Sequence, residues 1–183
     1  MNFSEESIFF IQNWGIIEKL LSSEKDFRME FSGFLYSIEK ILAKKDWWTK
    51  ELVFEKRGQS QLYISKENWR LNGKDHFIWI GVERFTPERL LGVEEPADCY
   101  LWVTGDEKDK IIADLSQMLK NEDYFNDYLS GSGGYVLKKY LKKYTEEEYK
   151  DFVSGDSLNE IVEFFENMYL FIKDYEISDP PTP

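Results

Sequence analysis

The sequence is poor in the residues that most often carry chemistry or covalent cross-links. Cys99 is the only cysteine among 183 residues, so neither an intramolecular disulfide nor a cysteine-based zinc site can form. His76 is the only histidine, so a catalytic triad or a cysteine–histidine pair would have to use it. No catalytic signature surrounds His76, and Cys99 lies in an apolar run where thiols are usually inert. We therefore predict no histidine-based catalysis and a reducing compartment.

Long hydrophobic runs are missing as well. The longest, Phe77–Val82, has the length of a strand, whereas a membrane span needs roughly 20 residues. Glu5 and Glu6 stand where a secretory signal would carry basic residues. These features predict a cytoplasmic protein with no membrane partner.

Basic residues are scarce in the second half of the chain. Residues 1–92 hold 14 acids and 14 bases, whereas residues 93–183 hold 21 acids and 9 bases, which accounts for the formal net charge of −12. Binding to nucleic-acid phosphates needs lysine and arginine, so we expect no nucleic-acid partner of that kind. The same sign of charge disfavours an anionic membrane surface. A protein partner with a basic surface is the charged partner that remains.

Aromatic residues, in contrast, are abundant. They make up 17% of the chain, and hydrophobic residues make up 42%, which is more than a disordered acidic chain would contain. A length of 183 residues suits one domain with a full core. We expect a single domain over residues 1–177 and a disordered, proline-rich tail over residues 178–183.

Helical periodicity marks the first 45 residues. Ser4, followed by Glu5 and Glu6, predicts a helix N-cap with acids in the first turn. The apolar residues that follow at helical spacing are Phe10, Trp14, Ile17 and Leu21. Residues 22–25 interrupt this pattern, and a second helix is expected over residues 26–45.

The period then changes from 3.6 to 2, which predicts strands. We expect them over residues 50–56, 62–64, 76–85 and 98–104, with Asn72-Gly73 as a hairpin turn. The runs Phe77–Ile80 and Tyr100–Val103 are apolar at successive positions, as in central strands covered on both faces.

The last third is expected to be helical again. Helices are predicted over residues 109–120, 136–144, 146–153 and 158–176, the second being rich in lysine. The pairs Thr145 and Glu148, and Ser157 and Glu160, have capping-box spacing. The fold class is therefore α+β, with two N-terminal helices, a central antiparallel meander of four to five strands, and three to four C-terminal helices.

No motif predicts a cofactor or a metal. Gly131-x-Gly133-Gly134 lacks the Walker spacing, so we interpret it as a hinge. Glu55-Lys56-Arg57 has arginine where the Glu-x-Lys pattern of two-metal nucleases has lysine. Two groups of acids could supply oxygen ligands but do not match calcium-loop spacing. They are Glu94, Glu95 and Asp98, and Asp106, Glu107 and Asp109.

The densest negative charge lies over residues 144–179, where eleven acids meet only Lys150 and Lys173. We predict a non-catalytic protein-binding module, of the inhibitor, immunity or regulatory-subunit class, which engages a basic partner surface. Acids on this segment would steer the association and contact the rim of the interface. The candidate partner-binding acids are Glu146, Glu147, Glu148, Glu160, Glu163 and Glu166.

Other interpretations stay open at this point. Trp47 or Trp48 could anchor the partner, because exposed tryptophan is common at interface hot spots, or both could seal the junction of helix and sheet. The acids could serve only solubility. The chain could instead be a metal-dependent hydrolase that uses sheet-edge carboxylates, or a small-molecule binder with an aromatic pocket.

Overall fold

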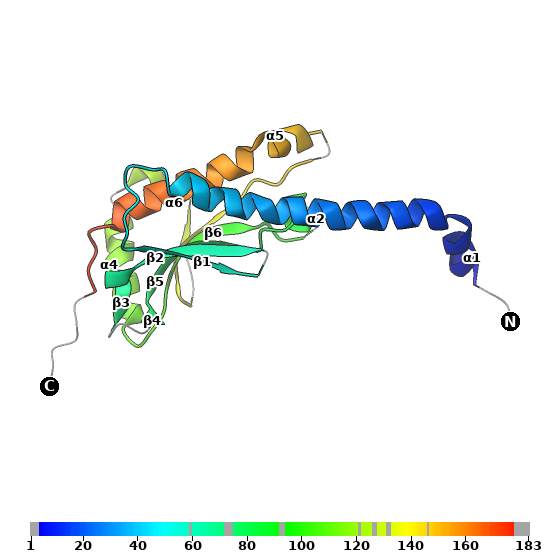
Figure 1. Ribbon diagram of the computed structural model, residues 1–183. Coiled ribbons are helices and arrows are strands. Elements are labelled where there is room, and N and C mark those ends of the chain that lie inside the picture. The colour runs from blue at the N-terminus through cyan, green and yellow to red at the C-terminus, as the bar shows by residue number, and fades with distance from the viewer. Residues whose placement is uncertain are drawn as a thin grey trace.

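A computed structural model describes residues 4–58, 60–71, 75–91, 94–120, 122–125, 128–130, 133–145 and 147–177. Helices at both ends of the chain enclose a series of strands, so the predicted α+β class is confirmed (Figure 1). The first half contains α1 (Glu5–Gln12), α2 (Trp14–Leu42), β1 (Leu52–Arg57), β2 (Gln61–Lys66), η1 (Glu67–Trp69), β3 (Arg70–Leu71), β4 (Asp75–His76), β5 (Ile78–Glu83) and α3 (Pro87–Leu90). The second half contains β6 (Asp98–Val103), α4 (Lys108–Leu119), η2 (Asp123–Phe125), β7 (Leu129–Ser130), β8 (Tyr135–Tyr140), α5 (Tyr149–Ser154) and α6 (Asp156–Ile172).

The main sheet is antiparallel, in the order β1-β2-β5-β6-β8-β7. Its first five members follow one another along the chain, which makes the five-stranded meander, and β7 pairs with the outer edge of β8. The short strands β3 and β4 pair separately, with Arg70 opposite His76. The predicted turn Asn72-Gly73 between them lies outside the described residues, as does the predicted tail over residues 178–183.

Alternation along the strands gives the sheet two different faces. On β5, Ile78, Ile80 and Val82 point into the core, and the intervening Trp79, Gly81 and Glu83 point to the opposite face. Helices α2 and α6 lie side by side on the core face (Figure 1). The central strands were expected to be covered on both faces; on the second face the cover consists of aromatic side chains packed against one another.

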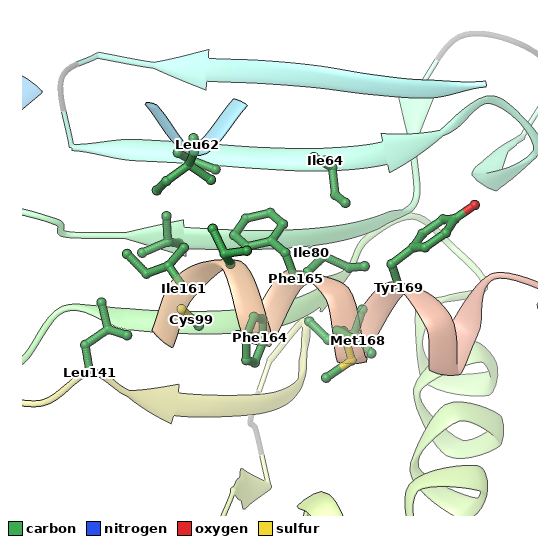
Figure 2. Close-up of a cluster of buried hydrophobic side chains, with 14 of the residues drawn as sticks. Leu62, Ile64, Ile80, Cys99, Leu141, Ile161, Phe164, Phe165, Met168 and Tyr169 are labelled. Carbon is green, nitrogen blue, oxygen red and sulfur yellow. The ribbon is translucent and has the colours of Figure 1, made fainter. Parts of the chain in front are cut away.

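Helix α6 fills the centre of the core. The residues of α6 that lie against the strands include Ile161, Phe164, Phe165 and Met168, and they meet Leu62, Ile64, Ile80 and Cys99 (Figure 2). All eight of these side chains are buried. The apolar spacing predicted for this helix is thus confirmed as a core stripe. The proposed Ser157 cap is wrong, because α6 already begins at Asp156, directly after Gly155 with a φ of 102°.

The boundary between the first two helices differs from the prediction. Ser4 caps α1 as expected, accepting a hydrogen bond from the Ser7 backbone N–H at 3.2 Å. The break falls at Asn13, however, and α2 runs without interruption through residues 22–25. An ion pair one turn long supports the continuity, because Glu24 pairs with Arg28 at 2.8 Å, and the hydroxyl of Ser23 is accommodated by donating to the Lys19 carbonyl at 2.9 Å.

Residues 136–144 were predicted as a lysine-rich helix, and this prediction is wrong. The segment forms β8 over Tyr135–Tyr140 and continues without regular structure. Pairing with β6 decides the outcome, with Leu101 opposite Leu137 and Asp98 opposite Tyr140. An apolar spacing of three to four residues is also compatible with a strand that contains a β-bulge. The pairing of β6 with β8 has such an irregularity, a register shift between Leu101 and Trp102. The helical period was therefore an ambiguous signal, and tertiary pairing resolved it.

Candidate functional site

Three of the predicted partner-binding acids already hold cations of the same chain. Glu166 Oε2 lies 2.7 Å from Lys45 Nζ, Glu160 Oε1 lies 3.1 Å from Lys139 Nζ, and Glu148 Oε1 lies 3.0 Å from Lys142 Nζ. Hydrogen bonding to Lys45 lowers the pKa of Glu166. These contacts reduce the negative charge that the set can offer to a partner.

The remaining acids of the set are placed differently. Glu147 and Glu163 are exposed, whereas Glu146 lies outside the described residues. Glu148 also accepts the Thr145 backbone N–H at 3.1 Å, and this bond is the main cause of its lowered pKa. The predicted capping box at Thr145 is nevertheless wrong, because α5 begins at Tyr149 and Glu148 itself is at the N-cap position. In the described part of this segment, exposed charge therefore remains at Glu147 and Glu163, while Glu148, Glu160 and Glu166 are paired with lysine.

Trp47 and Trp48 follow the end of α2 and are both half-buried against the core. The Trp47 ring stacks on Tyr169 of α6 at 4.7 Å, and its Nε1 donates to Glu166 Oε1 at 2.8 Å. These contacts agree with the interpretation that the pair seals the junction between helix and sheet.

The thiol considered for catalysis, that of Cys99, is not accessible to solvent. Cys99 is fully buried, and desolvation raises the pKa of its thiol well above the ordinary value. The side chain of His76 lies outside the described residues. The glycine-rich segment leads into strand β8 and not into a helix. It is therefore not followed by a helix N-terminus that could bind an anion.

Three of the six carboxylates considered as metal ligands pair with arginine or lysine instead. Glu94 contacts Arg89 at 3.0 Å, and Glu95 contacts Arg84 at 3.3 Å. Asp98 is fully buried and lies 2.8 Å from Arg84 and 2.5 Å from Lys138. Asp106, Glu107 and Asp109 are exposed around the start of α4. Within the described ranges, no group of three or more His, Cys, Asp or Glu side chains could hold a metal ion.

The first of two candidate sites is the N-terminal helical arm, which we define as residues 5–30. Figure 1 shows α1 and the first half of α2 extending away from the sheet and from α6. Large apolar side chains on the arm are between 40% and 65% exposed. They include Ile8, Phe9, Phe10, Ile11, Trp14, Ile16, Leu20, Leu21 and Phe27.

An ion pair separates the apolar residues of the arm from those by which α2 enters the core. The buried residues Phe31, Leu35, Ile38 and Leu42 recur at alternating steps of four and three. The same steps in the other direction pass Arg28 and Glu24, which pair with each other, before they reach Leu21, Ile17 and Trp14. The sequence pattern had identified the two apolar stripes, but it could not show that the core ends at Phe31.

The second candidate site is an aromatic pocket on the sheet face opposite α2 and α6. It encloses about 280 Å³. It is lined by Gln61, Trp79, Glu83, Tyr100, Trp102, Thr104 and Tyr135. Trp79 stands opposite Trp102 in the strand register, and Gly81 stands opposite Tyr100. The period-2 spacing of Trp79, Gly81 and Glu83 was a possible signal for this pocket, but the unbroken apolar character of the strands obscured it.

Two glycines allow the aromatic rings to lie flat on the sheet. A Cβ at Gly81 would stand 2.5 Å from the Tyr100 ring, and a Cβ at Gly134 would stand 2.7 Å from the Trp102 ring. Tyr135 then meets both rings almost at right angles, at 87° to Tyr100 and 85° to Trp102. The pocket is thus bounded by aromatic rings in two orientations.

The polar groups of the pocket are fixed by hydrogen bonds. Tyr135 donates its hydroxyl to Glu83 Oε1 at 2.7 Å, and Gln61 donates its amide to the Tyr100 hydroxyl at 3.2 Å. Desolvation raises the pKa of both phenols, so they stay neutral at physiological pH. Trp79 Nε1 is buried without a hydrogen-bond partner.

No family model, no curated protein and no solved structure matches this chain. None of the described helices is long and apolar enough to cross a membrane. The geometry of the arm and of the pocket is therefore the basis for any functional conclusion.

Proposed function

We propose that this protein acts by binding another protein, and that the helical arm enters an apolar groove with a basic rim on that partner. The observation that carries the proposal is the exposure of large aromatic and aliphatic side chains along residues 5–30. The class that this suits is an inhibitor, immunity or regulatory subunit in a reducing, cytoplasmic compartment, with no catalytic role of its own.

An extended helix of this composition gains little stability by itself. Most helical stability in proteins comes from packing of an apolar face, and α1 contains no buried residue. Contiguous exposed apolar surface of this kind marks an interaction site. Recognition of an amphipathic helix in a groove uses anchors at steps of three and four, and Trp14, Ile17 and Leu21 have this spacing.

Charge distinguishes between the molecules that could bind the arm. The arm itself carries six acids and three bases, and the whole chain carries a net −12. Association with a second copy would bring two negatively charged chains together, which is unfavourable, and an anionic membrane would repel the arm. A basic partner is attracted instead, and the exposed acids Glu147 and Glu163 would speed its approach.

The proposal is tested first by the state of the purified chain. Sedimentation velocity at micromolar concentration should give a monomer at physiological salt, and flotation with anionic phosphatidylserine vesicles should leave the protein in solution. A dimer that dissociates on Leu21→Asp would identify a second copy as the occupant. Binding to the vesicles would identify a membrane. Either result would overturn the assignment of a basic protein partner.

The partner contact is tested by matched variants. Immobilised full-length protein should capture a basic protein, and a purified sample of that protein should then bind wild type directly. Ile17→Asp together with Leu21→Asp should abolish binding, whereas Leu170→Asp, an equally drastic change at an exposed site on α6, should not. The association rate should fall steeply as salt rises. Retention of full affinity by the arm variant would refute the proposal.

A further inference from the structure

The aromatic pocket has the composition of a binding site for a positively charged organic group. From its lining we infer that it binds an organic ammonium or guanidinium ion, with the cation against the rings of Trp79, Trp102, Tyr100 and Tyr135 and beside the Glu83 carboxylate. The pocket and the arm share no residue, so this inference stands or falls separately from the proposed partner contact.

The sign of the ligand follows from the only charged group in the lining. Among the seven lining residues, Glu83 is the only aspartate, glutamate, lysine, arginine or histidine. Tyr135 donates to one of its two oxygens, Oε1, and Oε2 can accept from a ligand. Arg84 Nε lies 3.7 Å from Glu83 Oε1, but Arg84 does not line the hollow. Within the hollow an anion would therefore meet the negative carboxylate, whereas a cation would meet the opposite charge.

The rings supply the second part of the recognition. The faces of tryptophan and tyrosine attract cations electrostatically, most strongly where water is excluded. Because Tyr135 stands nearly perpendicular to Tyr100 and Trp102, a group in the hollow meets ring surfaces from more than one direction. Such an arrangement suits a compact group of near-spherical shape better than a flat ring.

Two of these rings already attract cations of the protein itself. Lys138 Nζ lies 4.4 Å from the centroid of Tyr135, and the Arg57 guanidinium lies 5.2 Å from that of Trp79. Neither cation lines the hollow. Lys138 is held in place by Asp98, with Nζ 2.5 Å from Oδ2. The ring system is thus suited to positive charge, and the hollow offers a further position for it.

Size limits the ligand to a small group. Pockets for drug-sized molecules enclose roughly 300–1,000 Å³. The hollow, at about 280 Å³, suits the end of one lysine, methylated lysine or arginine side chain, or a free ion such as choline.

Calorimetric titration of the full chain tests the inference. The probes are choline, N-acetyl-trimethyllysine methylamide, N-acetyl-lysine methylamide and N-acetyl-arginine methylamide, with 3,3-dimethylbutanol as the neutral isostere of choline. At least one cation should bind saturably at a 1:1 ratio and more than about tenfold more tightly than the isostere. Preference for the amino-acid amides would identify a protein side chain as the natural ligand, and preference for choline would identify a small molecule.

Variants locate the binding to the pocket. Glu83→Gln keeps an acceptor for the Tyr135 hydroxyl but removes the charge, and should weaken cation binding about tenfold. Glu94→Gln, the same change outside the pocket, should leave it unaltered. If Glu83→Gln does not fold, Trp102→Phe provides the second variant and should also weaken binding. Equal binding of the neutral isostere, unchanged affinity in a folded pocket variant, or no saturable binding of any cation would overturn the inference.

Discussion

Arg28 and Glu88 are 60 residues apart in the sequence, and their side chains meet at 2.6 Å. Arg28 lies on α2 at the point where the arm leaves the sheet, and Glu88 lies on α3. Arg28 also bonds Glu24 one turn earlier on its own helix. The two contacts connect the direction of the arm to the domain that carries the core.

This relationship predicts that Arg28→Ala loosens the arm without unfolding the protein. Exposed ion pairs contribute at most about 1 kcal/mol, and both side chains here are partly exposed. The melting midpoint should therefore fall by no more than about 2–4 °C. Amide hydrogen exchange over residues 14–28 should become faster, while the exchange of β5 and β6 stays slow. Unchanged exchange in the arm would contradict the role given to Arg28.

Gly81→Ala should destabilise the protein through the pocket. The added methyl group would stand 2.5 Å from the Tyr100 ring, and forcing extra volume into a packed site typically costs about 1–3 kcal/mol. Gly33→Ala is the matched control, because nothing lies within 4 Å of its Cβ position and helix propensity favours alanine by roughly 1 kcal/mol. Urea denaturation should show opposite signs for the two variants.

Asp98→Asn should be among the most destabilising single substitutions. Asp98 is fully buried between Arg84 and Lys138, and removing one member of a buried ion network typically costs about 3–5 kcal/mol. Glu95→Gln removes a second carboxylate from the same Arg84, but the Glu95 side chain is 79% exposed. Its loss should cost less than about 1 kcal/mol. Equal costs in chemical denaturation would show that burial does not set the strength of this network.

Acid should weaken the contact between α6 and the end of α2. Lys45 lowers the folded pKa of Glu166 below its ordinary value of 4.5. The contribution of Glu166 is therefore fully present above pH 4.5 and is lost as pH falls through the lower, folded value. In Glu166→Gln, the free energy of unfolding should fall less between pH 5 and pH 3 than in wild type. Glu163→Gln, an exposed change on the same helix, should follow the wild-type curve more closely.

A metal titration tests the hydrolase alternative. Of the carboxylates proposed as ligands, Glu94, Glu95 and Asp98 contact arginine or lysine, whereas the others are exposed around the start of α4. A metal bound only by the native state would raise the melting midpoint by mass action. We therefore expect Mg²⁺, Mn²⁺ and Ca²⁺ to leave the midpoint unchanged. A saturable increase with any of them would favour a metal-dependent activity over the binding function.

Much of the fold could be predicted because local signals agreed with the final contacts. The Ser4 cap, the strand periods around β5 and β6, and the apolar stripe of α6 each correspond to an observed element. The prediction failed for residues 136–144, where β8 obtains its hydrogen bonds from β6. The spacing of apolar residues along the sequence does not show whether a neighbouring strand is available to pair with the segment.

The candidate sites were less accessible from sequence than the fold. Glu148, Glu160 and Glu166 were identifiable as acids, but the lysines that pair with them come from other segments. Trp79 and Tyr135 belong to strands separated by more than fifty residues, and only the sheet brings them into one pocket. The charge of a residue can be read from its type, whereas its partners depend on the path of the chain.

The sequence alone determined the class of fold, the excess of negative charge and two apolar stripes, one ending at Leu21 and one containing Phe31, because composition and periodicity are properties of the chain itself. Only the tertiary structure decided which stripe is buried and which is exposed. The sheet ends before the helix does, so Phe31 enters the core while Leu21, on the same helix, remains exposed to solvent.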